Sequence, residues 1–242
     1  MYGRKEVMKV KKDVMILTGA GQIGMAIARR MGYGKKIVIG DKKPENAQKI
    51  AEIMNNAGFD AEAVEMDLSS REYIRNLIAR AMECGVGVTI SSQSGHRMPA
   101  LRPEEDELLA CTPAEELLQL DILQLENIRD TLHAYQLAKR CNEKRVMAEA
   151  VKWGKRNARI NSISPGIIVT PLAVDELNGP RGDFYKNMFA NCPAGRPGTA
   201  DEVANAAELL MSDKGAFITG ADFLIDGGAT ASYFYGPLKP EK

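Results

Sequence analysis

The sequence predicts an α/β fold of the Rossmann type, in which a doubly wound parallel sheet lies between two layers of helices in a single domain. Three observations lead to this class. Strand and helix patterns alternate along the chain, the strand patterns are short apolar runs typical of buried parallel strands, and a glycine-rich turn follows the first of them. The length of 242 residues and a hydrophobic content of 45% suit one such domain.

The first elements follow one another closely. Val14–Leu17 is the first predicted strand, and the predicted helix Met25–Met31 comes after a glycine loop. Lys36–Gly40 is the second strand, and the amphipathic helix Glu45–Asn56 follows Pro44, a residue that favours a helix start. The alternation continues with a strand over 61–66, a helix over 69–84, a strand over 87–92, a long helix over 127–154, a strand over 158–163, small helices over 174–191, a helix over 201–211 and a strand over 221–225.

Composition argues against several classes of protein. The formal net charge is zero, so no basic excess indicates a nucleic-acid partner. No apolar segment approaches the roughly 18 residues of a membrane span. The four cysteines are far apart and form no Cys-x-x-Cys pair. We therefore expect reduced thiols in a cytoplasmic protein, with no disulfide framework and no metal site.

The glycine loop has the spacing G-x-G-x-x-G, with Gly19, Gly21 and Gly24 around Gln22 and Ile23. Glycine permits the tight turn and lets the backbone approach a pyrophosphate, which then lies at the positive end of the helix dipole. The loop follows a strand and opens a helix, and Asp41 stands about 20 residues further on, at the end of the second strand. This context predicts a dinucleotide site.

Asp41 favours NAD over NADP. A carboxylate accepts hydrogen bonds from the ribose 2′-hydroxyl and repels a 2′-phosphate. Lys42 and Lys43 follow directly and weaken this preference, although two solvated lysines at a helix entrance also explain them. NAD is the expected cofactor, with NADP the alternative.

A pair of polar residues, Tyr135 and Lys139, lies in the long predicted helix, where a spacing of four places both on one face. A Lys ammonium near a phenol favours the phenolate, which would make Tyr135 a usable general acid or base. The same spacing recurs at Tyr235 and Lys239, but Gly236 and Pro237 break any helix there. The first pair is therefore the candidate.

Taken in order, these residues resemble the short-chain dehydrogenase/reductase family over nearly the whole chain. The resemblance rests on the Thr18-Gly19 loop, Asp67 after the third strand, Ser92 at a strand end, Tyr135-x-x-x-Lys139, Asn161 followed by Pro165-Gly166, and Asp226-Gly227-Gly228. The family implies a Rossmann fold, NAD(P) as hydride carrier, interconversion of an alcohol and a carbonyl, and a homodimer or homotetramer.

The resemblance also implies roles. Tyr135 resembles the proton donor to the substrate oxygen, Lys139 the residue that supports it and holds the nicotinamide ribose, and Ser92 the serine that hydrogen-bonds the substrate, with Ser94 as the runner-up. Further cofactor contacts are implied for Asp67, Leu68, Pro165, Gly166, Ile168 and Thr170. His96, Leu172 and Tyr185 are candidate substrate contacts, although a lone histidine or an apolar run is more often plain packing.

The sequence departs from the family in three places. The glycine loop is one residue shorter than usual, and Gln22 stands where the middle glycine would be. The interval from Ser92 to Tyr135 is 43 residues, which predicts an insertion over about 97–130, as a lid or a partner contact. The third helix runs almost directly into the Ser92 strand, so roughly forty residues, including the fourth strand, are predicted to be missing between about Met82 and Val88.

Two alternatives stay open. A protein without the fourth strand could be a dinucleotide-binding sensor or scaffold without turnover, or a truncated product. The aromatic residues Tyr233, Phe234 and Tyr235 near the C-terminus, within a tail over 229–242, favour a subunit contact. The substrate is expected to be a small alcohol or ketone.

Overall fold

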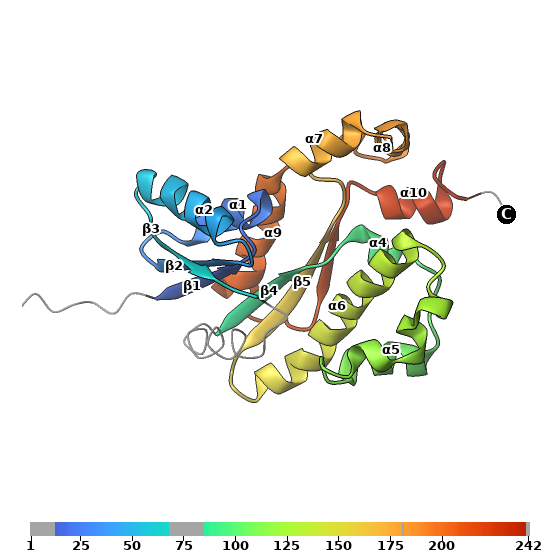
Figure 1. The fold of residues 1–242 in the computed structure, drawn as a ribbon, viewed down its shortest axis with the longest axis horizontal. Helices are drawn as coiled ribbons and strands as arrows, with labels where there is room; N and C mark the ends of the chain where they lie inside the picture. The colour runs from blue at the N-terminus through green and yellow to red at the C-terminus, as the bar shows by residue number, and fades with distance from the viewer. Residues whose placement is uncertain (1–12, 68–84, 181, 241–242) are drawn as a thin grey trace, which may run out of the picture. The chain divides into compact units, whose positions relative to one another are not determined.

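The computed structural model describes residues 13–67, 85–180 and 182–240 (Figure 1). The chain divides into two compact units, Met1–Cys84 and Gly85–Lys242, called here the amino-terminal and carboxy-terminal units. Each unit holds a three-stranded parallel sheet flanked by helices. The predicted Rossmann-type α/β class is confirmed, and the prediction of one domain stays a prediction. The helix predicted over 69–84 and Leu68 lie outside the described residues.

The sheet of the amino-terminal unit has the order β1-β2-β3 and parallel pairing throughout. Its strands are β1 (Val14–Thr18), β2 (Lys36–Asp41) and β3 (Asp60–Glu65), and its helices are α1 (Gln22–Met31) and α2 (Pro44–Asn56). Figure 1 shows both helices on one face of this sheet. The core between them is formed by Ala28, Ile37, Ile39, Ala47, Ile50, Ala51 and Met54. β2 is buried because its Ile-Val-Ile run packs on both sides.

The carboxy-terminal unit has a parallel sheet in the order β4-β5-β6. Its strands are β4 (Val86–Ile90), β5 (Arg159–Pro165) and β6 (Asp222–Ile225). The long helix α6 (Thr131–Gly154) and the helix α9 (Ala200–Met211) lie on opposite faces of this sheet, which gives three layers (Figure 1). The remaining helices are α4 (Gln93–His96), α5 (Pro103–Cys111), α7 (Pro171–Asn178), α8 (Gly182–Asn191) and α10 (Ala229–Tyr235), with 3-10 turns at Leu117–Gln119, Asp121–Leu123, Leu125–Asn127 and Asp213–Gly215.

Several predicted boundaries were wrong for local reasons. The long helix begins at Thr131 and not at 127, because the Asp130 carboxylate accepts a hydrogen bond from the His133 N–H at 2.7 Å and caps the helix there. The strand predicted to reach Ser92 ends at Ile90, so Ser91 and Ser92 follow the strand. The helix α10 was not predicted; it follows Gly228, whose φ of 84° turns the chain into it.

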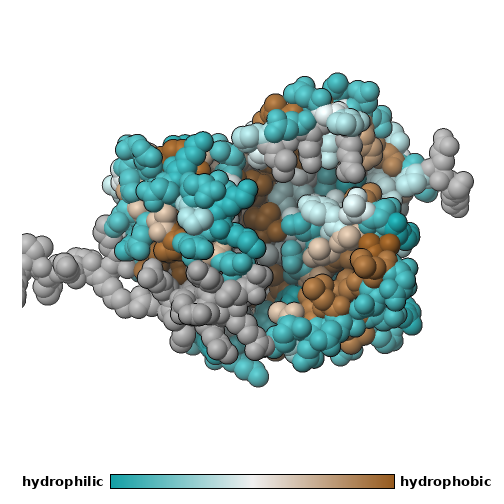
Figure 2. All heavy atoms as spheres, viewed as in Figure 1, coloured by the Kyte–Doolittle hydropathy of each residue, from teal (hydrophilic) through white to brown (hydrophobic). Residues whose placement is uncertain are grey.

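The predicted insertion contains α5 and three 3-10 turns, and α5 packs against α6. The Arg140 guanidinium donates to both oxygens of Asp106, at 2.7 and 2.6 Å. The Arg145 guanidinium donates to the carbonyls of Leu109 and Thr112. Figure 2 shows hydrophobic residues exposed on the side where α5 and α6 lie, and the exposed leucines of this region include Leu118 and Leu125. A role as lid or partner contact stays a prediction.

Strand pairing bears on the predicted missing segment. Among the described strands, β1 pairs with β2 alone and β4 pairs with β5 alone. Residues 82–84 lie outside the described part of the chain, so the absence of a fourth strand stays a prediction. In the portion that is described, no helix is long and apolar enough to cross a membrane. Cys111, Cys141 and Cys192 are free thiols there.

Candidate active site

The glycine loop of the amino-terminal unit is shaped by its backbone. Gly19 has a φ of 87°, and its N–H donates to the Gly40 carbonyl of β2 at 2.7 Å. A Cβ on Gly24 would lie 2.7 Å from Leu17 Cδ1 and 3.3 Å from the Gly19 carbonyl oxygen, so only glycine lets α1 pack this closely on β1. None of the described side chains caps the start of α1. The N–H groups of its first turn therefore suit an anion such as a pyrophosphate.

Asp41 ties the end of β2 to this loop. Its carboxylate accepts hydrogen bonds from the Ala20 N–H at 2.8 Å and the Lys43 N–H at 2.9 Å. The bond from Ala20, with that from Lys43, holds the pKa of the Asp41 carboxyl below its usual value, although burial opposes the shift. Lys42 forms an ion pair with Asp67, with the nitrogen 3.2 Å from a carboxylate oxygen. An anionic carboxylate beside uncapped backbone N–H groups could hold a dinucleotide, and the contacts of Asp41 and the glycine loop with one stay predictions.

Tyr135 and Lys139 lie one turn apart on α6 in the carboxy-terminal unit. The Lys139 Nζ is 5.5 Å from the centre of the Tyr135 ring, and it lies 3.5 Å from the Ile90 carbonyl oxygen at the end of β4. Tyr135 is 46% exposed, so its hydroxyl is accessible to a ligand. The predicted pairing of an amine with a phenol is therefore present, and the roles of the two residues stay predictions.

Three serines follow β4, and each has a different partner. The Ser91 hydroxyl donates to the Lys139 carbonyl at 2.8 Å, which joins the end of β4 to α6. The Ser92 hydroxyl accepts a hydrogen bond from the Ser94 N–H at 3.2 Å and caps α4. The Ser94 hydroxyl accepts from the Arg97 guanidinium at 3.4 Å. Ser92 and Ser94, the first and second choices for the substrate contact, are both buried.

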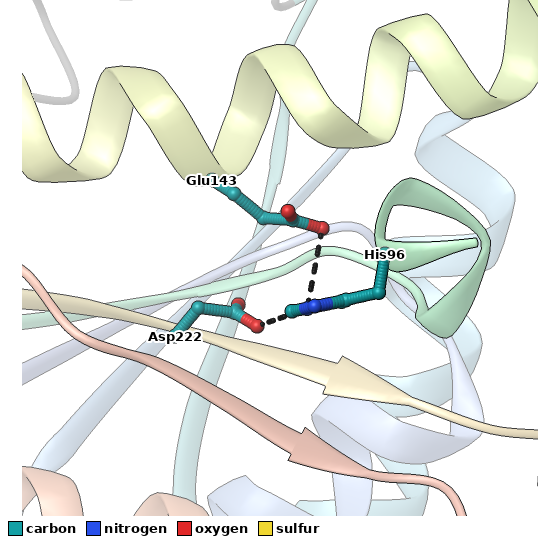
Figure 3. Close-up of side chains that lie close together, drawn as sticks. All are labelled: His96, Glu143 and Asp222. Atoms are coloured by element: carbon teal, nitrogen blue, oxygen red, sulfur yellow. Dashed lines mark hydrogen bonds and ion pairs between the residues drawn. The ribbon is translucent and has the colours of Figure 1, made fainter. Parts of the chain in front are cut away.

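A partly buried polar cluster, formed by His96, Glu143 and Asp222, joins α4, α6 and β6 (Figure 3). The His96 Nε2 lies 2.7 Å from an Asp222 oxygen and 3.7 Å from a Glu143 oxygen. The Ser162 and Ser164 hydroxyls of β5 lie 2.5 and 3.0 Å from an Asp222 oxygen, and the Ser91 and Ser164 hydroxyls lie 3.2 and 3.3 Å from a Glu143 oxygen. His96 thus faces two carboxylates, and its predicted substrate contact stays a prediction.

Electrostatics in this cluster follow from burial and pairing. The hydrogen bond to Asp222 raises the pKa of His96, against the effect of burial. Burial raises the pKa of the Glu143 carboxyl. Burial also opposes ionisation of Asp222, but bonds from His96 and the two serines outweigh it and lower its pKa. These three residue types could hold a metal ion. Each already has a hydrogen-bond partner, so the cluster is complete as a proton-sharing network.

The loop after β5 is held by close backbone contacts. A Cβ on Gly166 would lie 2.8 Å from the Asp226 Cα. Glycine at this position therefore allows the two backbone segments to approach this closely. The Asp226 carboxylate accepts from the N–H groups of Gly228 and Thr230. Thr170 caps the start of α7 by accepting from the Ala173 N–H at 3.2 Å. The side chain of Leu172 lies outside what the structure describes.

A cavity of about 360 Å³ opens at the carboxyl ends of β5 and β6. Two predicted cofactor contacts, Gly166 and Ile168, line it, whereas Ser94, His96 and Tyr185 are not among its lining residues. Tyr185 packs edge-on against Phe184, with ring centres 5.6 Å apart. Gln93, the residue after Ser92, does line the cavity and was not predicted. Its position beside Ser92 was the one signal that could have indicated it.

Comparison with known proteins identifies the family. A family model described as short chain dehydrogenase matches residues 13–96, and one described as Enoyl-(Acyl carrier protein) reductase matches residues 107–230. A 2,5-dichloro-2,5-cyclohexadiene-1,4-diol dehydrogenase, LinX, of Sphingobium indicum is 30% identical over 90% of this chain and 95% of its own length. The chain belongs to the short-chain dehydrogenase/reductase family.

A further relative and a solved structure are also similar to the chain. The short-chain dehydrogenase/reductase bsc3 of Alternaria brassicicola is 29% identical over 92% of this chain and 97% of its own length. The crystal structure of gox2181 has a TM-score of 0.68 at 22% identity, covering 92% of this chain and 97% of that one. At that identity the solved structure shows the fold alone. Family membership makes the chain an oxidoreductase of a class that uses NAD or NADP.

The alignment with bsc3 spans 267 positions, more than the 242 residues of the whole chain. This relative therefore contains residues without a counterpart in the present sequence. The segment predicted to be missing between about Met82 and Val88 stays a prediction.

Proposed function

We propose that the protein is an NAD(P)-dependent short-chain dehydrogenase/reductase that interconverts an alcohol and a carbonyl compound. The observation that carries this proposal is the Tyr135–Lys139 pair on α6, with Lys139 lying next to the end of the strand that leads to Ser92. The names of relatives support the class, since one is a diol dehydrogenase and another, from Bacteroides fragilis, a 7alpha-hydroxysteroid dehydrogenase.

Each unit is considered by itself, with the roles proposed for its own residues. In the amino-terminal unit, the N–H groups at the start of α1 would hold the pyrophosphate, and the Asp41 carboxylate would accept from the adenosine ribose. When bound, the dinucleotide supplies a nicotinamide ring that gives or takes a hydride. In reduction, the Tyr135 hydroxyl donates its proton to the substrate carbonyl oxygen, and the Ser92 hydroxyl donates a hydrogen bond to the same oxygen. The Lys139 ammonium stabilises the phenolate that remains.

NAD is the proposed cofactor in preference to NADP. Asp41 supports this, because its bonds from Ala20 and Lys43 keep the carboxylate anionic where a 2′-phosphate would otherwise lie.

We also propose a cytoplasmic homo-oligomer. Exposed Phe234 and Tyr235 at the C-terminal helix favour a subunit contact, and light scattering of the purified chain would test it.

The test of the proposed function is the variant Tyr135→Phe, which removes one hydroxyl and keeps the ring. Turnover of a panel of alcohols with NAD⁺ should fall by about 10²- to 10⁴-fold. NADH binding, followed by its fluorescence, should persist. Tyr235→Phe is the matched control and should behave as the unsubstituted protein. Full turnover by Tyr135→Phe would contradict the mechanism.

A sensor or scaffold is the alternative function predicted from the sequence. The unsubstituted protein would then bind NADH with no oxidation by any ketone in the panel. The binding and turnover arms of the same experiment separate the two functions.

A further inference from the structure

Several polar residues line the cavity at the carboxyl ends of β5 and β6, namely Gln93, Arg196, Glu202, Asn205 and Asp226. Gln93 differs from the others in its hydrogen bonding, and the proposed mechanism does not use its amide. Gln93 is 4% exposed, and its Oε1 has no hydrogen-bond partner. Its Nε2 has only the thioether sulfur of Met188, at 3.7 Å. Buried polar atoms in native proteins are almost always paired, so an unpaired one in a cavity wall indicates a missing ligand.

The contrast with the His96 cluster sharpens this point. Glu143 is also buried and His96 and Asp222 are partly buried, yet each is hydrogen-bonded within the protein. The Gln93 amide differs because its oxygen accepts no hydrogen bond and its NH₂ group donates only to the Met188 sulfur, which is a weak acceptor. The terminal torsion of glutamine is broad, so the amide can turn toward a bound molecule at little cost.

The other lining residues define the rest of the ligand. Most of the wall is apolar, and its larger members are Ile167, Ile168, Met188, Phe189, Val203 and Ile225. A volume of about 360 Å³ is at the lower end of the range for small-molecule sites. These features suit a small molecule with an apolar body.

The charged lining residues already have partners within the protein. Arg196 donates to both oxygens of Glu202, at 2.9 and 2.6 Å, so this pair presents no free charge. Asp226 is bonded by the N–H groups of Gly228 and Thr230. A neutral ligand is therefore favoured over a carboxylate or a phosphate. Because the Gln93 oxygen can only accept, that ligand must carry a hydrogen-bond donor.

We propose that Gln93 is a specificity-determining residue that accepts a hydrogen bond from a second hydroxyl of the substrate, so that the enzyme prefers small diols of apolar body to simple alcohols. Gln93 directly follows Ser92, the residue assigned to the reacting oxygen, so the second hydroxyl lies in the cavity beyond the reacting carbon. This inference rests on the proposed function, which assigns Ser92 and Tyr135 to the reacting end.

The experiment compares trans-1,2-cyclohexanediol with cyclohexanol as substrates of the full chain with NAD⁺. Gln93→Met keeps the length of the side chain and removes the amide. The ratio of kcat/KM for the diol to that for cyclohexanol should fall by about fivefold to tenfold, the value of one neutral hydrogen bond. Gln119→Met makes the same change at an exposed position outside the cavity and should leave the ratio unchanged.

Thermal unfolding distinguishes recognition from a structural role. Because the Gln93 oxygen has no partner in the protein, Gln93→Met should keep or raise the Tm. A fall in Tm, loss of folding, or an unchanged selectivity ratio would overturn the proposal.

Failure of the proposed function is separately visible. If the unsubstituted protein oxidises neither alcohol, calorimetric titration of the diol into the protein with NAD⁺ decides the matter. Diol binding that is lost in Gln93→Met would support the recognition role even then. Absence of diol binding to the unsubstituted protein would overturn it.

Discussion

The candidate functional residues of the two units belong to different chemical groups. The amino-terminal unit uses its backbone. Gly19 has a positive φ, and a Cβ on Gly24 would force neighbouring atoms to move. The N–H groups at the start of α1 have no side-chain cap. Asp41 is its one described polar side chain bonded to that loop. The carboxy-terminal unit uses side chains, because Ser91, Lys139, Glu143 and Asp222 are held by bonds between elements far apart in the chain.

This difference fits the roles proposed for the two units. A pyrophosphate is recognised by N–H groups that any glycine-rich turn at a helix start can offer, so few side chains are needed. Proton transfer requires particular side chains at particular positions, and these must be fixed by packing and by second hydrogen bonds. Substitutions should therefore act through backbone geometry in the first unit and through hydrogen-bond networks in the second.

The largest expected effect is in the carboxy-terminal unit, at Asn161. This side chain is fully buried, donates to the Ile218 carbonyl at 3.0 Å and accepts from the Ala221 N–H at 3.1 Å. Asn161→Leu should lower the free energy of unfolding by about 2 to 5 kcal/mol, because two backbone groups lose their partner. Chemical denaturation measures the change. The exposed Asn178→Leu is the control, and an equal loss in both variants would show that the network does not stabilise this unit.

In the amino-terminal unit the corresponding test is Gly24→Ala. The added methyl would meet Leu17 Cδ1 at 2.7 Å, so α1 must move away from β1 at a cost of about 1 to 3 kcal/mol. NAD⁺ affinity should weaken as well, since the first N–H groups of α1 move with the helix. Leu17→Val shortens the opposing side chain, so the double variant should be more stable than the sum of the single changes predicts. Strict additivity would mean that close packing does not fix the loop.

The sequence predicted site residues that lie close together in the chain and missed those that only folding brings together. Gly19, Gly24 and Asp41 belong to a local pattern of strand, turn and helix, so their spacing alone indicated the site. Tyr135 and Lys139 are one helical turn apart and could be paired in the same way. Glu143 and Asp222 were missed, because their contacts with His96 span 47 and 126 residues of chain and depend on how α6 and β6 pack. Gln93 was missed because a free amide oxygen is visible only after its surroundings are known.

Asp41 offers the next, smaller effect, and it acts on cofactor choice. Asp41→Asn keeps the shape of the side chain and removes its charge. The ratio of kcat/KM with NADP⁺ to that with NAD⁺ should rise by about tenfold, because a 2′-phosphate no longer meets a like charge. Initial rates with both cofactors measure the ratio. Glu45→Gln, a charge removal at the start of α2, is the control, and an equal change in both variants would assign the preference to general charge.

The smallest effect concerns the two histidines, and it distinguishes the side-chain cluster from an ordinary surface site. The bond to Asp222 raises the pKa of His96, and its carboxylate neighbours Glu143, Asp222 and Asp226 add to this against burial. The folded chain thus binds more protons at His96 than the unfolded chain does. The stabilisation is complete below the ordinary pKa of 6.5 and is lost as the pH rises through the raised value.

His133 has the opposite sign. Burial, together with Arg129, lowers its pKa, so its protonation destabilises the fold as the pH falls below 6.5. The difference in unfolding free energy between the unsubstituted protein and His96→Gln should therefore shrink, by less than about 1 kcal/mol, from pH 6 to pH 8. For His133→Gln, the unfolding free energy of the unsubstituted protein should rise relative to that of the variant from pH 5 to pH 7. Denaturation curves at each pH give both slopes. Equal slopes would mean that His96 gains nothing from the carboxylates around it, and that the cluster joining α4, α6 and β6 is held by its serine hydroxyls alone.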